Sequence, residues 1–474
     1  MTGKAWRVLA PAVAAVACGG GASPVSAPAP SPPPPKPNIV FILTDDLDSR
    51  SMDILPRLPA LMTQAGLSFP RYYVTHSLCA PSRASILTGQ YTHNHRVLYN
   101  LGPDGGFPGF HSRGLEASTV ATWLKAAGYR TALIGKYLND YATGASETYV
   151  PPGWDEWRGD LTADLDLRYY NYSLNENGTV VTYGQAPQDY STDVFAGQAV
   201  AFIRRAAADA TTPFFLYLAP QAPHKPAVYA DRHSHEFKGG GAFRVPSFNE
   251  DDVREKPSFV QNVAHMNAHE IQLLDELQVS RLRSMLAVEE MVDQVLQALI
   301  ASGRLENTYI FFTSDNGLEM GEHRLAGRKN VNYEEAIKVP LVVRGPGVPA
   351  GQSRPHPVLN IDLAPTFAEL AGARVPDTVD GRSFAPLLRG TPPGPETWRK
   401  DFLVEYYDAD VSAGVRSEDY LYNYLESYEV EFYDMRTDPY QLHNLQRHVD
   451  PSVLEPFSRR LQELLACRAA SCRP

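Results

Sequence analysis

Four short apolar segments, each followed at once by polar or charged residues, most constrain how this chain can fold. They span residues 38–43, 131–135, 214–219 and 308–313. Continuous runs of this kind, rich in β-branched and aromatic residues, are typical of strands buried on both faces of a sheet. Amphipathic helical patterns lie between them, at residues 117–128, 193–208 and 278–303. This alternation predicts an α/β fold in which helices sandwich a large, mixed, mostly parallel sheet.

The residues that follow the four segments carry the chemistry. Asp45 and Asp46 follow the first, Lys136 the second, His224 the third, and Asp315 and Asn316 the fourth. Each alone is also explained as a turn, a helix cap or solvated surface. The carboxyl ends of parallel strands meet at one edge of a sheet, however, and ligands bind there. The coincidence of all four therefore predicts a functional site at this edge.

Size and charge narrow the class of protein further. The chain has 474 residues, of which 43% are hydrophobic and 20% are charged, so it can bury a large core. We expect one large domain and a smaller one. The formal net charge is −11, and no run of five or more basic residues occurs. Such a chain would repel a polyanion, which predicts that it does not bind nucleic acid.

The N-terminus has the layout of a secretory signal. Lys4 and Arg7 precede a short apolar run at 8–17, which is too short to span a bilayer, and Cys18 follows. Two processing routes fit: cleavage after Ala17, or lipidation of Cys18. The second is favoured because the Gly- and Pro-rich residues 19–37 would tether a folded domain to a membrane. We predict export to the bacterial periplasm or cell surface.

Export makes the four cysteines interpretable. Cys18 is at the processing site, and Cys467 and Cys472 are close enough to form a disulfide. Cys79 is left without a partner, and a buried, inert thiol is the simplest explanation from the count alone. Pro81 suits the first position of a helix, so Cys79 would lie at a helix N-terminus, where an anion is favoured.

The segment around Cys79 carries a resemblance to a known family. The residues "CAPSRASILTG" (79–89) resemble the C-x-P-S-R-x-x-x-L-T-G signature of type I sulfatases. In that family the cysteine is oxidised to Cα-formylglycine (3-oxoalanine), and the hydrated aldehyde attacks the sulfate sulfur. Further family blocks follow in order, so the resemblance covers nearly the whole chain from residue 38: "NIVFILTDDLD", "GKYLNDY", "APQAPHKP", "TSDNGLEMGEHRL", "GRKNVNYEEAIKVPLVVRGPG" and "EFYDMRTDPYQLHNL". It implies an alkaline-phosphatase-like fold and a smaller C-terminal α+β domain with an antiparallel sheet.

The resemblance also implies roles for individual residues. The metal ligands would be Asp45, Asp46, Asp315 and Asn316, with an oxygen derived from Cys79 as a further ligand. Oxygen-only ligands with three carboxylates suit a hard cation, so Ca²⁺ is expected, with Mg²⁺ as the alternative. Arg83 would hold the hydrated aldehyde. Lys136, His224 and Lys329 would surround the sulfate, and His224 or Lys329 would protonate the leaving oxygen.

Several further residues have an open role. Many arylsulfatases carry a histidine at the position of Leu138, so the general base is not identified. His93 and His95 are candidates, and they are equally explained as residues that shape a surface loop or the sugar pocket. His323 is interpreted as a support for Asp315 or as a loop residue without a role. Asp362 is predicted to cap a helix, and Glu405 to lie near the sugar.

We predict a signal peptide and tether at 1–37, a catalytic domain at 38–383 and a smaller domain at 384–474. The expected reaction is hydrolysis of the sulfate ester of a sulfated sugar, of the 6-O-sulfated N-acetylglucosamine type. A formylglycine-generating enzyme would first have to modify Cys79. This substrate rests on the resemblance of "GKYLNDY", "PPGWDEW", "YTHNHRV" and the terminal Cys-x4-Cys to N-acetylglucosamine-6-sulfatases and heparan 6-O-endosulfatases. The long basic insert of the endosulfatases is missing, which favours a small substrate. The alternatives are a phosphonate monoester or phosphodiester hydrolase, and a lipoprotein that binds sulfated glycans without turnover.

Overall fold

A computed structural model describes residues 1–15, 35–162, 168–407 and 412–473. The chain divides into two compact units, Met1–Pro35 and Lys36–Pro474. Cys18 and most of the predicted tether lie outside the described residues, so their processing stays a prediction, as do the domain boundaries. Among the helices that are described, none is both long enough and apolar enough to cross a bilayer.

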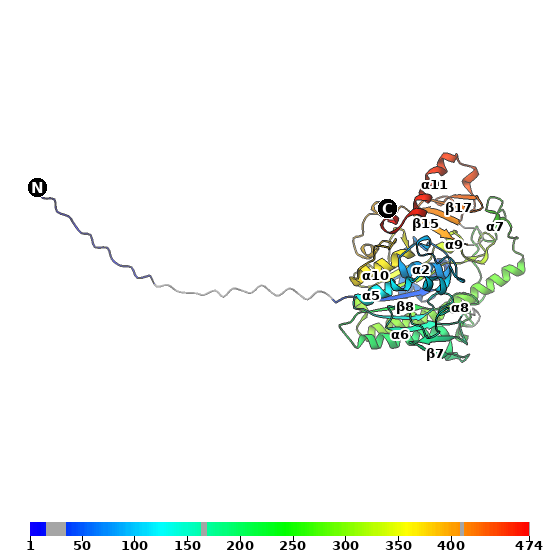
Figure 1. The fold of residues 1–474 in the computed structure, drawn as a ribbon, viewed down its shortest axis with the longest axis horizontal. Coiled ribbons are helices and arrows are strands. Elements are labelled where there is room, and N and C mark those ends of the chain that lie inside the picture. The colour runs from blue at the N-terminus through cyan, green and yellow to red at the C-terminus, as the bar shows by residue number, and fades with distance from the viewer. Residues whose placement is uncertain (16–34, 163–167, 408–411, 474) are drawn as a thin grey trace. The chain divides into compact units, whose positions relative to one another are not determined.

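A sheet of ten strands forms the centre of the second unit (Figure 1). Its order is β13-β2-β12-β9-β1-β8-β4-β5-β6-β7. The five central strands, β9 to β5 in this order, run parallel, and antiparallel pairings begin at β12 on one side and at β6 on the other. The bounds are β1 (Asn38–Thr44), β2 (Leu67–Ser68), β4 (Arg130–Gly135), β5 (Glu156–Asp160), β6 (Ser173–Glu176), β7 (Thr179–Thr182), β8 (Phe214–Ala219), β9 (Thr308–Ser314), β12 (Leu341–Arg344) and β13 (Gln352–Ser353).

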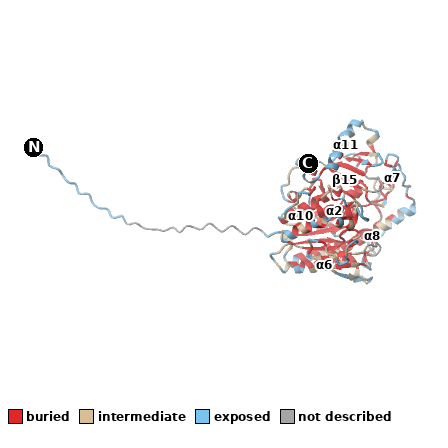
Figure 2. Ribbon diagram, viewed as in Figure 1, coloured by how far each residue is buried: buried red, intermediate tan, exposed pale blue. Residues whose placement is uncertain are grey.

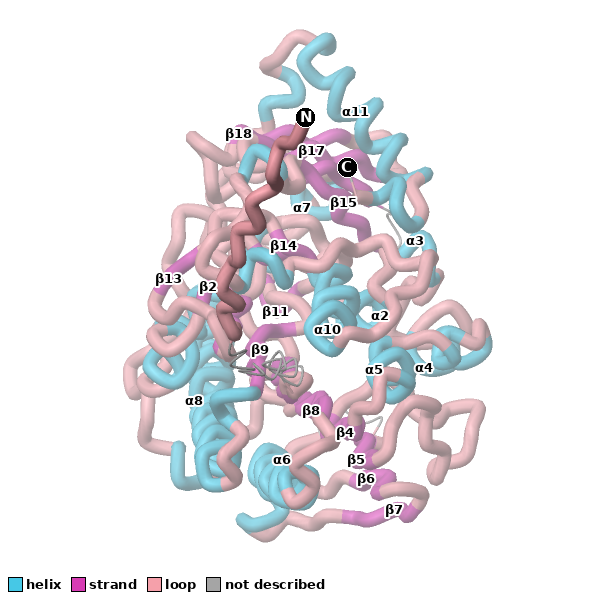
Figure 3. The backbone as a smooth tube through the Cα atoms, turned by 90° about the vertical axis from the view of Figure 1, so that its left-hand side faces the viewer, coloured by secondary structure: helices cyan, strands magenta, loops and turns pink. Residues whose placement is uncertain are grey.

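Strand β1 is buried on both faces, which explains its unbroken apolar sequence. Ile39 and Phe41 point into one hydrophobic core, and Val40 and Ile42 point into the other. Helices on one face are α2 (Cys79–Thr88), α5 (Val120–Ala126) and α10 (Leu363–Ala371), and those on the other are α6 (Ser191–Ala207) and α8 (Ala268–Ala301) (Figures 1 and 3). The predicted fold class is therefore confirmed.

Two helix starts differ from the sequence prediction. Helix α8 begins ten residues earlier than expected, at Ala268, because Asn267 accepts hydrogen bonds from the N–H groups of His269 and Glu270 and so caps it. Most of its first residues are exposed, and the apolar ones, Ile271, Leu274 and Leu277, pack in a small cluster separate from the two main cores. Helix α2 begins at Cys79, so Pro81 is the third helical residue and not the first. A proline fits there because the first four N–H groups of a helix have no partner within it.

A smaller antiparallel sheet follows near the C-terminus, as predicted (Figure 1). Its strands are β15 (Asp401–Tyr406), β16 (Ser412–Ser417), β17 (Tyr420–Leu425) and β18 (Val430–Asp434). Helix α11 (Pro451–Ala466) packs on it through Phe457, whose ring contacts those of Tyr420 and Phe432. The predicted disulfide between Cys467 and Cys472 is present. Buried residues run through both sheets (Figure 2).

Asp362 occupies the N-cap position of helix α10, as predicted, but its side chain makes no capping hydrogen bond to that helix and instead caps the preceding 3-10 turn, Asn360–Asp362. Its side chain accepts two hydrogen bonds from the guanidinium of Arg399, at 2.6 and 2.9 Å, and others from the N–H groups of Leu359 and Arg382. Both charged side chains are buried. The buried guanidinium offers a charge-assisted, two-point partner, which a cap position would not provide.

Candidate active site

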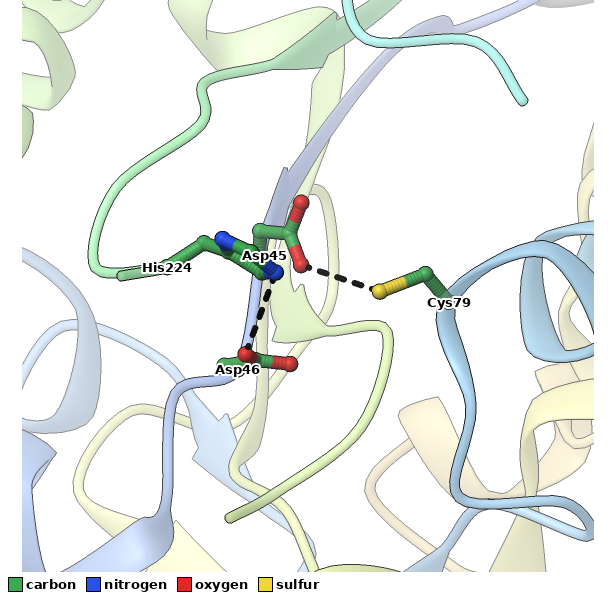
Figure 4. A group of neighbouring side chains, drawn as sticks. All are labelled: Asp45, Asp46, Cys79 and His224. Carbon is green, nitrogen blue, oxygen red and sulfur yellow. Dashed lines mark hydrogen bonds and ion pairs between the residues drawn. The ribbon is translucent and has the colours of Figure 1, made fainter. Parts of the chain in front are cut away.

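The polar residues after the four central strands meet at one edge of the sheet. Strands β9, β1, β8 and β4 are consecutive neighbours, so their carboxyl ends lie side by side. The backbone N–H of Asp46 donates to Asp315 Oδ1 at 3.2 Å, and His224 Nε2 lies 3.7 Å from Asp46 Oδ2 (Figure 4). The juxtaposition predicted from the strand pattern is thus present.

Two glycines allow the segments at this edge to come close together. Gly135 has a φ of +102°, and a Cβ there would lie 2.1 Å from the carbonyl oxygen of Ala219. The N–H of Lys136 then donates to the same oxygen at 2.9 Å, which fixes where the lysine leaves β4. A Cβ on Gly317 would lie 2.0 Å from Glu335 O. Side chains at these two positions would push the site apart.

Cys79 lies in the middle of this group, at the first residue of helix α2. Its thiol is buried and donates to Asp45 Oδ1 at 3.4 Å (Figure 4). The ammonium of Lys329 lies 2.8 Å from its sulfur. Burial, reinforced by the charge of Asp45, raises the pKa of the Cys79 thiol to about 11. The unmodified thiol is therefore protonated at neutral pH and is a poor nucleophile.

Three cations balance the three buried carboxylates of the site. Lys136 contacts Asp45 Oδ2, Arg83 Nε donates to Asp315 Oδ2 at 2.8 Å, and Lys329 Nζ donates to Asp46 Oδ1 at 2.5 Å. Burial alone would raise the pKa of Asp45, but the surrounding positive charges, that of Lys136 foremost, outweigh it and hold the pKa well below its usual value. By contrast, burial and the charge of Asp45 raise the pKa of Asp315.

The donor set fits a hard divalent cation. Ligand atoms of Asp45, Asp46, Cys79 and His224 all lie within 4.8 Å of one another. Within the described part of the chain, Asn316 Oδ1 is buried without a hydrogen-bond partner, while its Nδ2 donates to Asp46 Oδ1 at 2.5 Å. An unpartnered amide oxygen beside ionised carboxylates is a ligand that Ca²⁺ or Mg²⁺ accepts. The predicted ligands Asp45, Asp46, Asp315 and Asn316 thus lie together, beside Cys79.

His224 presents an unprotonated nitrogen to the site. Its Nδ1 lies 2.5 Å from the carbonyl oxygen of Lys225, so Nδ1 carries the proton and Nε2 has the free lone pair. Burial lowers the pKa of His224 to about 4, although Asp46 and Asp45 act in the opposite direction. Nε2 can accept a proton, and it can donate one only after it has gained it.

The other sequence candidates lie in supporting positions. His95 is buried, contacts Ser85 Oγ at 3.0 Å and accepts from the N–H of Val97. His93 Nδ1 lies 3.3 Å from both carboxylate oxygens of Glu405, which is itself buried beneath it. None of these contacts is to Lys136, Arg83 or Lys329, or to the carboxylates that these three cations contact. The structure therefore favours positioning roles for these three residues.

His323 does not support Asp315. Its Nδ1 lies 2.7 Å from Glu250 Oε2, and its ring packs on that of Tyr333 with centroids 4.3 Å apart. Burial lowers its pKa well below the ordinary value. The tight turn at Gly321 places the imidazole beside Glu250 instead. Glu250 lies in a loop far away in the sequence, so no local pattern predicts this contact.

Arg281 and His76 were missed by sequence analysis. Arg281, on helix α8, is buried, and its Nη2 donates to the carbonyl oxygen of Asp46 at 2.6 Å and to Asp48 Oδ2 at 3.2 Å. His76 Nε2 lies 2.8 Å from Asn330 Oδ1, and so connects the segment before Cys79 to the residue after Lys329. An arginine within an amphipathic helix resembles a solvated residue, so no local signal marks Arg281.

Comparison with known proteins places this fold and site among hydrolases. A family model described as Sulfatase matches residues 37–373, and one described as N-sulphoglucosamine sulphohydrolase, C-terminal, matches residues 321–467. The N-acetylglucosamine-6-sulfatase of Capra hircus is 35% identical over 481 residues, which cover 92% of this chain and 84% of that protein. The chain therefore belongs to the sulfatase family and is a sulfuric ester hydrolase.

Solved structures agree with this assignment. A protein in complex with its substrate D-glucosamine-2-N,6-O-disulfate has a TM-score of 0.74 and 25% identity, over 91% of this chain and 97% of that chain. The phosphonate monoester hydrolase of Agrobacterium radiobacter has a TM-score of 0.71 and 22% identity, over 91% and 95% of the two chains. The second likeness is one of fold alone.

Proposed function

We propose that this protein hydrolyses the sulfate ester of a sulfated sugar of the 6-O-sulfated N-acetylglucosamine type, through a formylglycine formed from Cys79. The observation that carries the proposal is the position of Cys79, buried between the Asp45 carboxylate and the Lys329 ammonium at the start of helix α2. A thiol with a raised pKa serves poorly there, whereas a hydrated aldehyde offers two hydroxyl groups on one carbon.

The reaction would proceed in two steps, a displacement at sulfur followed by an elimination that releases sulfate. One hydroxyl of the hydrated residue 79 loses its proton and its oxygen bonds to sulfur, while the bond from sulfur to the sugar oxygen breaks and that oxygen takes a proton. The second hydroxyl then loses its proton, the aldehyde C=O bond re-forms, and the C–O bond to sulfate breaks. Water restores the hydrate. A serine or thiol has no second hydroxyl and could not release sulfate this way.

The side chains of the site suit these steps. Lys136 and Lys329 bring positive charge to where the non-bridging sulfate oxygens would lie, and Arg83 holds Asp315 in place. His224 Nε2 and Lys329 Nζ are the groups that can exchange a proton with the sugar oxygen. A divalent cation held by Asp45, Asp46, Asp315 and Asn316 would act as a Lewis acid, and Ca²⁺ is our proposal.

The proposed substrate rests on the relatives. The Capra hircus protein is named an N-acetylglucosamine-6-sulfatase, and the structural neighbour holds a glucosamine sulfated at the 6-oxygen. The net charge of −11 opposes the approach of a long polyanion and supports a small substrate. Export to the periplasm or cell surface, and lipidation of Cys18, remain proposals from the sequence.

The experiment compares esters on protein that has been produced with a formylglycine-generating enzyme. Mass spectrometry of the tryptic peptide that contains residue 79 should show CHO in place of CH₂SH. We expect N-acetylglucosamine-6-sulfate to be cleaved faster than isomers sulfated elsewhere and faster than a phosphodiester. A preference for the phosphodiester would replace this proposal with the alternative hydrolase. An unmodified Cys79 in active protein would refute the mechanism.

A pair of lysine variants tests the site itself. Lys329→Ala should lower kcat/KM for the sulfate ester by about 10²–10³, the effect of losing one group that stabilises developing charge. Lys400→Ala is the matched control because Lys400 is exposed. Equal activity of the two variants would remove Lys329 from the mechanism.

A further inference from the structure

Three buried glutamates gather beside the active site without taking part in it. Glu319 in β10 (Glu319–Met320), Glu322, and Glu335 in α9 (Glu334–Ile337) have 0%, 2% and 7% of their surface exposed. Carboxylates are almost never buried this deeply unless they are paired or bind a cation. The question is what balances them.

Arg50, in helix α1 (Ser49–Asp53), is the cation that contacts this cluster. Its guanidinium lies 3.0 Å from Glu335 Oε1 and 3.5 Å from Glu322 Oε1. The nearby cations Arg416 and Lys338 pair with Glu334 instead. When all three carboxylates are ionised, one guanidinium leaves two negative charges unbalanced, which is the charge of one divalent cation.

The carboxylate oxygens of this cluster also accept few hydrogen bonds. Glu322 Oε2 accepts from the N–H of Met320 at 2.6 Å. Both carboxylate oxygens of Glu319, and Oε2 of Glu335, are buried and make no close hydrogen bond among the described residues, although the nearby backbone of Ala336 favours the ionised form of Glu319. Burial and the charges of Glu335 and Glu322 raise the pKa of Glu319 well above its usual value, and burial with Glu335 raises that of Glu322 to about 8. The cluster must therefore hold protons or a cation.

The cluster borders a cavity on one side, at Glu335. A cavity of about 300 Å³ is lined by Arg50 and Glu335, and also by Asp48 and Tyr440. Hard cations take six to eight oxygen ligands and commonly keep water among them. We propose that Glu319, Glu322 and Glu335 bind a second divalent cation, Ca²⁺ in an exported protein, and that water from this cavity completes its coordination.

The geometry also indicates how tightly such an ion would bind. Among the described residues, the group with ligand atoms within 4.8 Å of one another is the catalytic one, Asp45, Asp46, Cys79 and His224. The carboxylate oxygens of the three glutamates lie farther apart, so these side chains have to move together around the ion. A site that must rearrange binds weakly, in the range of about 10⁻⁴–10⁻³ M known for extracellular calcium modules. The ion would brace the loop between Asn316 and Lys329, in which Glu319 of β10 pairs with Arg328 of β11 (Ala326–Arg328), and would tie it to Glu335, whose carbonyl oxygen packs closely against Gly317.

The test counts calcium on chelator-treated full-length protein. Equilibrium dialysis against 5 mM CaCl₂, about five times the weakest expected dissociation constant, is followed by elemental analysis. Glu319→Gln should bind one calcium ion fewer per chain than Glu426→Gln, a matched control at an exposed glutamate. Equal calcium content in the two variants overturns the proposal.

A calorimetric titration of the wild-type protein with CaCl₂ needs no variant to fold. Two classes of site, or a single class that Glu319→Gln or Glu335→Gln removes, support the proposal. A single class that both variants leave intact overturns it and leaves the catalytic site as the binder. The loss of a single class on Glu319→Gln would instead contradict the catalytic cation, so the two proposals fail separately.

Discussion

At the scale of residues, the candidate site is a balance of buried charges. Lys136 and Lys329 contact carboxylates that a divalent cation would also contact, so the ammonium groups help to hold these acidic side chains in place. Removing one partner from such a group leaves an uncompensated buried charge, which is costly. We therefore expect that neutralising one of the aspartates, or removing one of the lysines, will change the metal affinity or the activity.

The buried histidine that precedes Cys79 makes stability depend on pH. Burial lowers the pKa of His76 to about 4, against about 6.5 in an unfolded chain. The folded pKa is the lower one, so the stabilisation is complete above pH 6.5 and is lost as the pH falls from 6.5 towards 4. Between pH 7.5 and pH 5, this residue should account for a loss of about 2 kcal/mol in the free energy of unfolding.

Urea unfolding at the two pH values measures this effect. His76→Gln should reduce the loss on acidification by about 2 kcal/mol relative to wild type, because glutamine can still donate to Asn330 Oδ1 and does not titrate. His269→Gln, at an exposed position, is the control and should change nothing. A pH dependence identical in wild type and His76→Gln would show that His76 does not titrate in this window.

At the scale of elements, helix α8 does more than cover the sheet. Arg281 extends from it to the backbone of Asp46, a residue in the left-handed conformation with a φ of 68°. The same guanidinium reaches Asp48, at the start of helix α1. The long helix thereby orients one ligand of the proposed cation, Asp46, through the main chain that carries it.

Arg281→Met should weaken the cation site without removing a ligand. Loss of groups that orient metal ligands typically costs about 10–100-fold in affinity or activity, so the calcium concentration for half-maximal sulfatase activity should rise by about that factor. Arg283→Met is the control, because Arg283 bonds Glu236 O and Tyr229 instead. An unchanged calcium requirement in Arg281→Met would mean that the helix does not orient the site.

At the scale of the whole molecule, the acidic charge of the chain opposes its anionic substrate. With a net charge of −11, repulsion acts over the screening length, about 10 Å at 0.1 M salt. Raising NaCl from about 10 to 150 mM should therefore lower KM, and more for a polysulfated oligosaccharide than for a monosulfated sugar. Steady-state kinetics at the two salt concentrations check this. A KM that rises with salt for both substrates would show that the local cations dominate.

Much of the fold was predictable because the pattern of apolar residues along a segment shows which of its faces are buried. The unbroken apolar runs of β1, β4, β8 and β9 required a sheet covered on both faces, and parallel strands required their polar followers to meet. The starts of α2 and α8 were less predictable, since a capping side chain or a proline within the first turn changes a boundary without changing the apolar pattern.

By itself, the sequence determined the α/β class, the strand ends that form the site, and the signature around Cys79, because each depends on neighbouring residues. Tertiary structure alone decided that Asp362 pairs with Arg399, that His323 faces Glu250, and that Arg281 supports Asp46. These contacts join residues far apart in the chain. Their partners are selected by the distance and burial of charges in the folded molecule, and no local pattern records either quantity.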